Sequence, residues 1–546
     1  MNQKITFSII DDKFPSLVNS ITEYEKHCVT YLIHNDTQIY IGETSNFKRR
    51  ILDHSKSGGK KNLLKVKIIT SEYFNKSAVY DIETKLINYI YADNNLEVLN
   101  TKLNQNSHEY YMKSQINDSL FKNIWAALQK RKLARKSLQE LENTNLFKYS
   151  PFKEFSDEQY NIINEVIDHI TEKVSSKKET LAFDGSIVEP RRLKLKDESV
   201  LIHGAPGTGK SLLIVKIVHK LLKHYMLEDA KIAICVPQTA LQSTFKKMLK
   251  ESKINAKIIK PIEMSKNIED KYDLLIVDEA HRLKKHFNKQ TKDLKHLNKG
   301  EYTELDFAKT KSKHLILMYD EKQAVRPADL DISHVSKSDY KTFKLTQQFR
   351  VKKSTNYLCF IEGILQLSNH KSIKDDLGGY DFRICTSINQ LYSEILKKEK
   401  IYGQCRLGSG YFVKWISKKN NSLYDFEQEG IKIQWNTKIA GWAQDPKSIN
   451  EIGCIHTLQG QDLNYAGIII GDDIYLDPVD NKIKINPDMY FDQNGTPING
   501  TDIGNTQLTR FIKNIYYVLL TRGMLGTYVY IKDPTLRDFL SKILSR

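Results

Sequence analysis

The sequence has few cysteines and no long hydrophobic run, and both absences narrow what the protein can be. Its six cysteines are scattered singly among 546 residues, and no Cys-x-x-Cys pair occurs. This spacing argues against a disulfide framework and against a zinc ribbon. No stretch approaches the roughly 18 consecutive apolar residues of a membrane-spanning helix, and the amino terminus lacks the apolar core of a signal peptide. We therefore expect a cytoplasmic protein without a membrane segment.

Acidic residues are scarce relative to basic ones. The chain has 83 Lys and Arg residues against 66 Asp and Glu residues, and so a net charge of +17. The lysines are spread along the whole length, which suits a polyanionic partner that is approached over a broad surface. The alternative is that the lysines only solvate the surface of a protein from a lysine-rich proteome.

Short apolar segments alternate with helix-length stretches after residue 199, and this alternation is typical of parallel sheets covered by helices. The expected strands are Val200–His203, Ile232–Val236, Leu274–Val277 and Leu315–Tyr319, followed by Phe382–Thr386, Tyr411–Ile416, Ile431–Trp435, Ile468–Ile470 and Tyr528–Ile531. The two sets predict two α/β lobes. The first hundred residues instead place short strands around one helix, and the polar stretch 106–150 suits a helical linker.

A complete phosphate-binding loop follows the first of these strands. It consists of Gly204, Ala205, Pro206, Gly207, Thr208, Gly209, Lys210 and Ser211. Because an apolar run precedes it and an apolar helical stretch follows it, backbone N–H groups and a positive helix end would face a triphosphate. Lys210 would reach the β- and γ-phosphates, and the Ser211 hydroxyl would take one Mg²⁺ position. A glycine-rich turn could meet the spacing by accident, but these flanks argue against it, and we expect ATP or a relative of it.

A pair of carboxylates, Asp278 and Glu279, comes directly after the apolar strand that ends at Val277. Carboxylates at the carboxyl end of a parallel strand lie in the crevice where phosphates bind. Asp278 can hold Mg²⁺ through water, and Glu279 can orient and deprotonate the attacking water. Alone, such a pair is usually a solvated turn, but its place about seventy residues after the phosphate loop favours an ATPase site.

Further blocks resemble those of superfamily 1 helicases and come in the same order. They are Phe155–Gln159, Val236–Ala240, Tyr319–Gln323, Leu345–Arg350, Ile455–Asp462 and Val518–Gly523. The resemblance implies two RecA-like lobes, with Gln159 reading adenine, Gln323 sensing the γ-phosphate, and Arg350 and Arg522 acting as arginine fingers. An arginine from the opposite lobe neutralises transition-state charge only when the lobes close, so hydrolysis would be tied to lobe motion.

Within that superfamily, the second lobe is most similar to the Schlafen-type helicase-like ATPases. The similarity lies in the run Arg406–Tyr411, followed by Trp415 and later by Trp435 and Trp442. The whole motor is confined to residues 151–546, which leaves little room for the accessory domains of processive unwinding enzymes. This favours translocation or remodelling over long-range unwinding.

The amino-terminal hundred residues carry a second set of functional residues. Tyr31 and Tyr40 lie on two short strands, Arg50 and His54 project from one helix face at i, i+4 spacing, and Glu83 lies in an apolar helix. With Asn100, these positions resemble a GIY-YIG nuclease domain over about residues 27–102. Val29 departs from the pattern, which has glycine there, at a position that is structural. A small β-hairpin with packed tyrosines is the alternative interpretation.

The resemblance implies a metal-dependent cut of a phosphodiester. Glu83 would hold one divalent metal, Arg50 would stabilise phosphoryl charge, and a tyrosine or His54 would accept the proton of the attacking water. Arg49 is the neighbouring alternative to Arg50. We choose Arg50 because it stands ten residues after Tyr40 and four before His54.

Together these patterns predict an ATP-dependent nucleic-acid translocase fused to an endonuclease. The expected domains are a nuclease domain at 1–105, a helical linker at 106–150, an ATP-binding lobe at 151–340 and a second lobe at 341–546. ATP with Mg²⁺ would serve the motor, a divalent metal would serve the nuclease, and the expected partner is DNA. We expect a role in anti-phage defence. The alternatives are a DNA-repair nuclease-helicase, or an ATP-switched nucleic-acid clamp whose amino-terminal domain only binds.

Overall fold

The structure is a computed structural model of the full chain. It describes residues 6–13, 27–56, 63–100, 110–150, 152–153, 155–173, 180–181, 187–188, 193–195, 198–224, 230–251, 254–266, 269–285, 302–330, 335, 339–351, 354, 356–367, 377–439, 441–492 and 502–545. The chain divides into two compact units, Met1–Lys194 with Val215–Glu228, and Leu195–Ile214 with Asp229–Arg546. Among the described residues, none of the helices combines the length and the apolar character needed to cross a bilayer.

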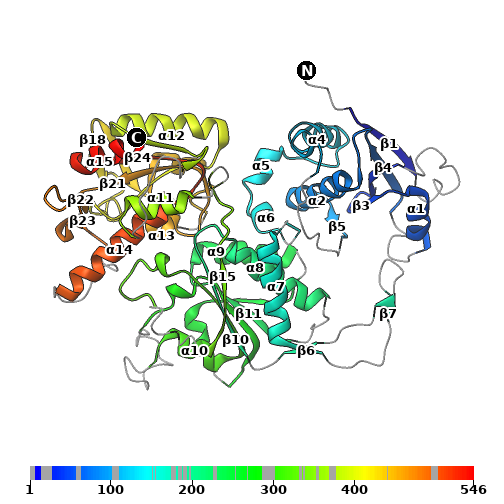
Figure 1. The fold of residues 1–546 in the computed structure, drawn as a ribbon, viewed down its shortest axis with the longest axis horizontal. Coiled ribbons are helices and arrows are strands. Elements are labelled where there is room, and N and C mark those ends of the chain that lie inside the picture. The colour runs from blue at the N-terminus through cyan, green and yellow to red at the C-terminus, as the bar shows by residue number, and fades with distance from the viewer. Residues whose placement is uncertain are drawn as a thin grey trace. The chain divides into compact units, whose positions relative to one another are not determined.

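The first unit contains a small five-stranded sheet, with strand order β1-β4-β2-β3-β5 (Figure 1). Its elements are β1 (Ser8–Lys13), β2 (Val29–His34), β3 (Gln38–Thr44), α1 (Phe47–Lys56), β4 (Lys65–Thr70), α2 (Lys76–Asp93) and β5 (Glu97–Val98). Strands β2 and β3 form an antiparallel hairpin. The Asn35 side chain closes its turn by accepting hydrogen bonds from the backbone N–H groups of Thr37 (2.9 Å) and Gln38 (2.7 Å).

Strand β2 is buried on both faces. Its successive side chains point to opposite sides of the sheet and meet two different cores. Leu32 and Ile41 belong to the core that includes Ile82 and Leu86 of α2. Tyr31 and Ile33 belong to a separate core with Phe47 of α1. Two different helices therefore cover the two faces of one hairpin.

The stretch that was expected to be a linker is helical over its described part, but it packs as part of the first unit. It contains α3 (Lys113–Gln115), the π-turn η3 (Ile116–Leu120), α4 (Phe121–Lys130), α5 (Leu138–Glu142) and α6 (Asn145–Lys148). The Tyr89 hydroxyl of α2 donates to Glu142 (2.6 Å), and Asp93 accepts from the backbone N–H of Lys136 (3.0 Å). Residues 110–150 thus form a helical cover on α2 and not a free connector. Residues 106–109 lie outside the described part.

The first unit also contains α7 (Asp157–Ile170) with short strands after it, and the stretch Val215–Glu228. The short strands are β6 (Thr171–Lys173), β7 (Thr180–Leu181), β8 (Ile187–Val188) and β9 (Leu193–Leu195). A capping box at Ser156 and Gln159 starts α7, because each side chain binds the backbone N–H of the other residue.

The second unit begins with a six-stranded parallel sheet in the order β12-β11-β13-β14-β10-β15. The elements from this point of the chain are β10 (Ser199–Gly204), α8 (Lys210–His219), η4 (Lys220–His224), β11 (Ile232–Cys235), α9 (Thr239–Glu251), β12 (Lys257–Ile259), η5 (Pro261–Ser265), β13 (Tyr272–Val277), η6 (Ala280–Arg282), α10 (Glu304–Lys311), β14 (Ser312–Tyr319), η8 (Glu321–Gln323) and β15 (Lys341–Leu345). Of these, η4 and the end of α8 from Val215 on belong to the first unit. Strand β15 pairs with β10. The sheet of the first lobe therefore extends past the expected boundary at residue 340, because the segment that follows it completes the sheet.

The second lobe has a seven-stranded sheet in the order β16-β24-β21-β17-β20-β19-β18, parallel except for the β18–β19 pair. It contains α11 (Tyr357–Ile364), β16 (Asp381–Cys385), α12 (Ile388–Tyr402), β17 (Arg406–Ser409), β18 (Phe426–Gln428), β19 (Ile431–Trp435), η12 (Pro446–Asn450), β20 (Glu451–Cys454), α13 (Ile455–Leu458), β21 (Leu463–Ile470), β22 (Ile474–Leu476), β23 (Ile483–Ile485), η13 (Pro487–Met489), α14 (Asp502–Leu520), β24 (Gly523–Ile531) and α15 (Pro534–Ser545). The expected architecture, a small mixed domain followed by two RecA-like parallel-sheet lobes, is confirmed.

One expected strand of this lobe is wrong. The sheet uses Arg406–Ser409, and the more apolar run 411–416 is not a strand. The reason is close packing, since a Cβ at Gly408 would lie 2.2 Å from Leu458 Cδ1 of α13. A glycine in this central strand lets α13 pack closely against it, and the apolar pattern of the sequence does not show where such a glycine is required.

Candidate active sites

The first site is built on the contact between Tyr31 of β2 and Gly42 of β3. The two residues are paired across the hairpin, and Tyr31 is fully buried. A Cβ at Gly42 would lie 2.3 Å from the Tyr31 hydroxyl. Glycine at position 42 is therefore required for the tyrosine ring to lie across the neighbouring strand.

Helix α1 brings Arg50 and His54 to the Tyr31 hydroxyl. The hydroxyl lies 2.7 Å from His54 Nε2, and Arg50 Nε donates to it at 3.3 Å. Arg50 is half-buried while Arg49 is exposed. The geometry thus brings Arg50, and not its neighbour, together with the buried tyrosine and histidine.

Tyr40 lies on the same face of β3 as Gly42. Its ring centroid is 5.1 Å from that of His54 and 6.3 Å from that of Tyr31. Burial raises the pKa of Tyr31 well above 10, and it also raises the pKa of Tyr40, with the Arg50 charge opposing both shifts. Both phenols therefore keep their protons near neutral pH and act as neutral hydroxyl groups.

Helix α2 presents Glu83, which is half-buried. Its charge is felt at both tyrosines, where it contributes to the raised pKa of Tyr31 and of Tyr40. Over the described ranges, no three His, Cys, Asp or Glu side chains gather closely enough to hold a metal ion. A lone carboxylate suits Mg²⁺, which keeps several waters and binds one or two carboxylates together with substrate phosphate oxygens.

Asn100 holds the backbone of β3 between Tyr40 and Gly42. Its side chain accepts from the Ile41 N–H (3.1 Å) and donates to the Ile41 carbonyl (2.7 Å). Val29, where the nuclease pattern has glycine, is fully buried in β2, so the departure leaves the strand intact.

Glu43 follows Gly42 in β3 and pairs with Thr30, so its side chain points to the face of the sheet opposite that of Tyr31. Glu43 is half-buried, and burial raises the pKa of its carboxyl group against the charges of Lys76 and Arg50.

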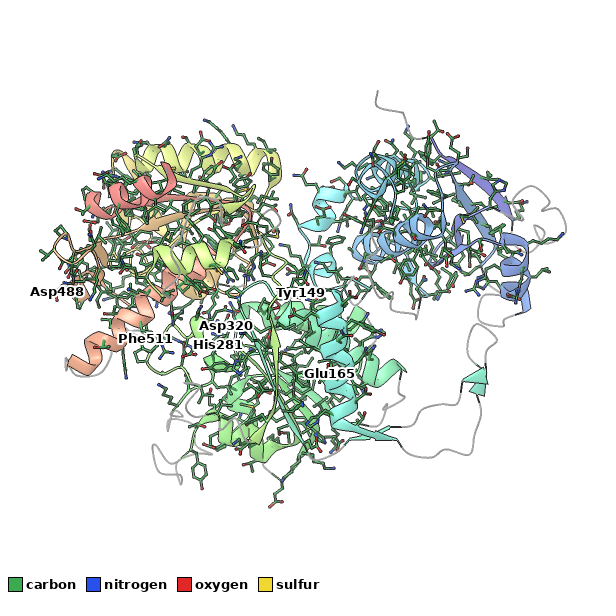
Figure 2. The ribbon with its side chains drawn as sticks, in the orientation of Figure 1. Tyr149, Glu165, His281, Asp320, Asp488 and Phe511 are labelled. Carbon is green, nitrogen blue, oxygen red and sulfur yellow. The ribbon has the colours of Figure 1, made fainter. Side chains whose placement is uncertain are left out.

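The second site lies at the carboxyl ends of β10, β13 and β14, which are neighbours in the first sheet of the second unit. Gly207 and Gly209 of the phosphate loop have φ angles of +82° and +86°, which favour glycine. Lys210 is buried, and its Nζ donates to the Gly204 carbonyl (2.5 Å) and lies 3.7 Å from Asp320 Oδ2. Figure 2 places Asp320 and His281 at this edge of the sheet.

The Ser211 hydroxyl donates to Asp278 Oδ2 at 2.9 Å, which joins the phosphate loop to the end of β13. Burial and the neighbouring Glu279 charge raise the pKa of Asp278. A hydroxyl and a carboxylate are hard oxygen ligands, so this pair fits Mg²⁺ bound together with nucleotide phosphates.

Glu279 adopts a left-handed backbone conformation, with φ of 50°, directly after Asp278. Burial alone would raise its pKa, but the charges of His281 and Lys210 hold the pKa of Glu279 below its usual range. His281 Nε2 lies 2.8 Å from Glu279 Oε2. Sequence reasoning missed His281, although it lies only two residues after Glu279; the structure places its ring against the Glu279 carboxylate.

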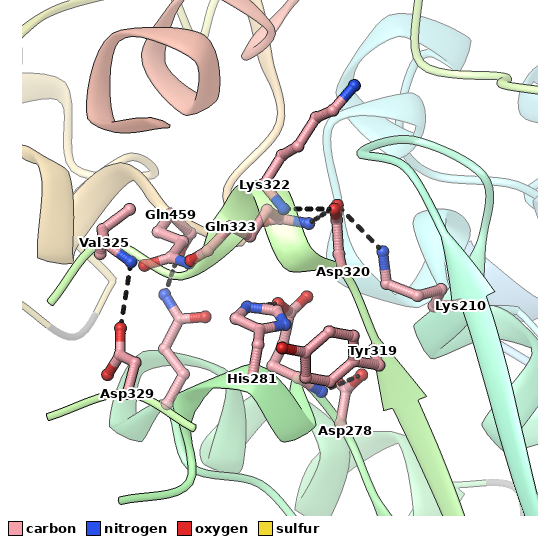
Figure 3. A network of polar contacts seen from close by, with 12 residues as sticks. Lys210, Asp278, His281, Tyr319, Asp320, Lys322, Gln323, Val325, Asp329 and Gln459 are labelled. Carbon is pink, nitrogen blue, oxygen red and sulfur yellow. Dashed lines mark hydrogen bonds and ion pairs between the residues drawn. The ribbon is translucent and has the colours of Figure 1, made fainter. Parts of the chain in front are cut away.

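A chain of amide groups crosses from the first lobe to the second (Figure 3). Gln323 Nε2 donates to Asp320 Oδ2 (2.7 Å), and the Gln323 carbonyl accepts from Gln459 Nε2 (3.0 Å). The Gln459 carbonyl in turn accepts from Gln238 Nε2. Buried glutamines therefore connect the blocks Tyr319–Gln323, Ile455–Asp462 and Val236–Ala240.

The structure brings both arginines to this site. The backbone N–H of Phe349 donates to the Gly207 carbonyl (2.8 Å), so Arg350 adjoins the phosphate loop, and its Nε donates to Asp462 of the second lobe (2.5 Å). Arg522 is buried, and burial together with the Arg350 charge lowers its pKa to about 9, while Asp462, Glu279 and Asp320 act in the opposite direction.

The second unit matches a known family model. Residues 197–533, more than half of the chain, match the model of the Schlafen group 3, DNA/RNA helicase domain. The chain belongs to this family. Residues 27–94 of this Schlafen group 3 protein match the model of the GIY-YIG catalytic domain. The protein is therefore an enzyme with a nuclease domain and a helicase-like ATPase domain.

Among curated proteins, the uncharacterized protein YPL245W of Saccharomyces cerevisiae is 28% identical over 389 residues, 62% of this chain and 83% of the relative. Among solved structures, the chain is similar to arterivirus nonstructural protein 10, a helicase, with 12% identity and a TM-score of 0.29 over 64% of this chain. It is also similar to Pif1 helicase, from a study of DNA unwinding at forked double-stranded DNA, with 11% identity and a TM-score of 0.28 over 72% of this chain. A third similar structure is the DNA-bound DUF1998 helicase MrfA, with 8% identity and a TM-score of 0.30 over 72% of this chain. The chain spans 62%, 97% and 51% of these three structures.

Gln159 is the one predicted ATP-site residue of this Schlafen group 3 protein that lies in the first unit. Its side chain accepts from the Ser156 N–H (3.1 Å) in the capping box of α7. Reading adenine therefore stays a prediction for Gln159.

Proposed function

We propose that this protein is an ATP-dependent nucleic-acid translocase joined to a divalent-metal-dependent endonuclease that cuts DNA. The observation that carries the proposal is the position of Arg522, a second-lobe residue buried among the charges of the first-lobe phosphate site. An arginine that reaches across the lobes makes turnover depend on how they close.

In the motor, the loop Gly204–Ser211 cradles the phosphates and Lys210 binds the β- and γ-phosphates. Ser211 and Asp278 hold Mg²⁺, and Glu279 orients and deprotonates the attacking water. Gln323 reports the γ-phosphate through Asp320, while Arg350 and Arg522 neutralise transition-state charge. The 2.9 Å Ser211–Asp278 hydrogen bond supports the magnesium site. The lowered pKa of Glu279 keeps its carboxylate charged, which suits orienting the attacking water.

In the nuclease, Glu83 holds one divalent metal, and Arg50 stabilises charge on the phosphoryl group. His54 and Tyr31 take the proton of the attacking water as a pair. Their 2.7 Å contact and the raised pKa of Tyr31 favour His54 as the acceptor, with Tyr31 as a neutral relay. Tyr40 completes the aromatic wall beside His54.

The net charge of +17 supports a polyanionic partner, and we take this partner to be DNA. A motor joined to a nuclease suits destruction of invading DNA, so we place the activity in cytoplasmic anti-phage defence. DNA repair uses the same pairing and is the alternative role.

The test uses the full chain with supercoiled plasmid, linear duplex and single strands, in Mg²⁺ with and without ATP. Glu83→Gln should lose divalent-dependent nicking by about 10³-fold or more, because metal stabilisation of the transition state is worth several kcal/mol. Lys210→Ala should lose most ATP hydrolysis and remain folded, because Lys210 acts on phosphates.

Matched controls are Glu72→Gln, an exposed carboxylate that precedes α2, and Lys257→Ala, an exposed lysine of the first lobe. Both should leave nicking and hydrolysis intact. Unaltered nicking by Glu83→Gln would remove the nuclease assignment. ATPase stimulation that saturates on short strands, and does not grow with strand length, would favour a clamp over a translocase.

A further inference from the structure

The segment between β17 and β18 exposes an unusual density of large apolar side chains. Ile416, Leu423 and Tyr424 are 43%, 44% and 49% exposed, and they are three of the ten exposed large hydrophobics among the described residues. All three lie within nine residues of sequence. Neither catalytic site uses this segment, which we call the 411–424 segment.

Aromatic rings support the base of the segment. Trp415 is half-buried, and its ring centroid lies 6.2 Å from those of both Tyr411 and Trp435. Tyr411 in turn lies 5.8 Å from His456, centroid to centroid. His456 is the second residue of the block Ile455–Asp462, which resembles a block of superfamily 1 helicases, so the rings are continuous with that block.

The segment is basic and has no acidic residue. Lys414, Lys418 and Lys419 are all exposed. Lys418 Nζ lies 5.5 Å from the Trp415 ring centroid. A surface that is only positively charged favours a polyanionic ligand, whereas a surface that binds another protein does not require such a charge.

The segment is held in place before any ligand arrives. Asp425 accepts from the backbone N–H groups of Ser417 and Trp435, both at 2.8 Å. Gln434 Nε2 donates to the backbone carbonyls of Asn421 (2.6 Å) and Leu423 (2.7 Å). A surface that is already ordered loses less entropy on binding.

We propose that the 411–424 segment binds single-stranded nucleic acid, with Trp415 stacking on a base and Lys414, Lys418 and Lys419 contacting phosphates. Aromatic platforms flanked by cations are how proteins bind single strands without reading sequence. The proposal rests on the proposed function, because it names where the motor grips the strand.

Intrinsic fluorescence of the full chain isolates Trp415. The chain has four tryptophans, and the other three, Trp125, Trp435 and Trp442, are at most 2% exposed. Oligo-dT and oligo-rU should therefore quench wild-type emission, and Trp415→Phe should lose the quenching while it keeps most of the affinity, since a phenyl ring still stacks. Equal quenching in Trp415→Phe would overturn the proposal. The two oligonucleotides tell DNA from RNA.

Affinity by fluorescence anisotropy gives the second measurement. Trp415→Ala should weaken binding roughly tenfold, within the range found for single stacking contacts. Lys418→Gln with Lys419→Gln should lower the slope of log affinity against log salt by about 0.7 for each lost phosphate contact. Tyr302→Ala, a 42% exposed aromatic of the first lobe, is the matched control and should bind normally.

The outcomes separate the two proposals. Wild-type protein that binds neither oligonucleotide would overturn both the proposed function and this surface. Normal affinity and salt slope in the Trp415 and lysine variants would overturn the surface alone, and would point to a protein partner for the exposed apolar side chains. A thermal melt of Trp415→Ala checks its fold, and Trp415→Phe keeps the packing against Tyr411 and Trp435.

Discussion

The two candidate catalytic sites of this protein are assembled in opposite ways. The nuclease site takes all its residues from one small sheet and two helices between Tyr31 and Asn100. The ATPase site takes residues from Gly204 to Arg522 and joins two separate parallel sheets. One site is local in sequence, and the other spans most of the second unit.

This difference changes what holds each geometry in place. Tyr31, His54 and Phe47 are buried together, and the Tyr31 and Phe47 ring centroids are 5.5 Å apart, so side-chain packing holds the nuclease site. The ATPase site depends on contacts across the lobes, such as Arg350 with Asp462 and Gln459 with Gln323. The first site is therefore fixed by its core, whereas lobe motion can make or break the second.

The largest effect is expected at the ATPase site, where removal of a second-lobe arginine tests whether the site depends on both lobes. Arg522→Ala should keep nucleotide binding but lower ATP turnover by about 10³-fold, because comparable arginine fingers contribute that much. Phosphate release at saturating ATP, together with fluorescent-nucleotide binding, measures the two separately. Plasmid nicking without ATP should be unchanged, because no nuclease residue comes from the second lobe.

Arg383→Ala is the control for that variant, since Arg383 is an exposed arginine of the same lobe that pairs with Asp381. It should turn over ATP normally. Normal turnover in Arg522→Ala would mean that the ATPase site is complete within the first lobe, and the contrast between the two sites would fail.

A second prediction tests whether packing holds the nuclease site. Gly42→Ala should reduce nicking by about 10²-fold, because its Cβ would displace the Tyr31 hydroxyl from His54, and misplacement of about 1 Å costs that much. Overpacking should also lower the free energy of unfolding by about 1–3 kcal/mol. Single-turnover nicking and chemical denaturation measure both quantities, and ATPase activity should persist.

Gly430→Ala provides the matched glycine substitution. Gly430 also resists a side chain, with φ of +80°, but no atom lies within 4 Å of its Cβ position. Gly430→Ala should lower the free energy of unfolding by about 1 kcal/mol and leave both activities intact. If Gly42→Ala nicks DNA as fast as Gly430→Ala does, the close Tyr31–Gly42 contact is not needed for catalysis.

The smallest expected effect concerns an ion pair between the lobes. Arg510 of α14 lies 2.8 Å from Glu321, and the two side chains are 43% and 53% exposed. A double-mutant cycle with Arg510→Ala and Glu321→Ala should give a coupling of about 0.2–1 kcal/mol, reduced by salt. ATP turnover should change by no more than a few fold.

Lys309 and Asp339, an exposed pair of the first lobe at 3.2 Å, give the matched cycle within one lobe. Its coupling should be similar, but ATP turnover should not change at all. A large loss of turnover from Arg510→Ala would show that a surface pair, and not the buried amides, controls closure.

Much of the grouping of residues in both candidate sites was predictable from sequence, because their motifs are local. The spacing of Arg50 and His54 is one helical turn, and the phosphate loop is a continuous run, so short-range geometry identifies them. Contacts that depend on distant segments were missed, among them those of Arg350 with Asp462 and of Gln459 with Gln323. The strand Arg406–Ser409 was missed for a related reason, since its glycine serves a helix that comes fifty residues later.

The sequence by itself determined the chemical groups of this protein: a phosphate loop, two carboxylates after a strand, and a tyrosine–arginine–histidine–glutamate set. These follow from local spacing along helices, strands and turns. The tertiary structure alone decided which groups meet, placing the Tyr31 ring over Gly42 and Arg522 beside Arg350. Such contacts arise when packing brings together segments whose spacing in sequence carries no sign of it.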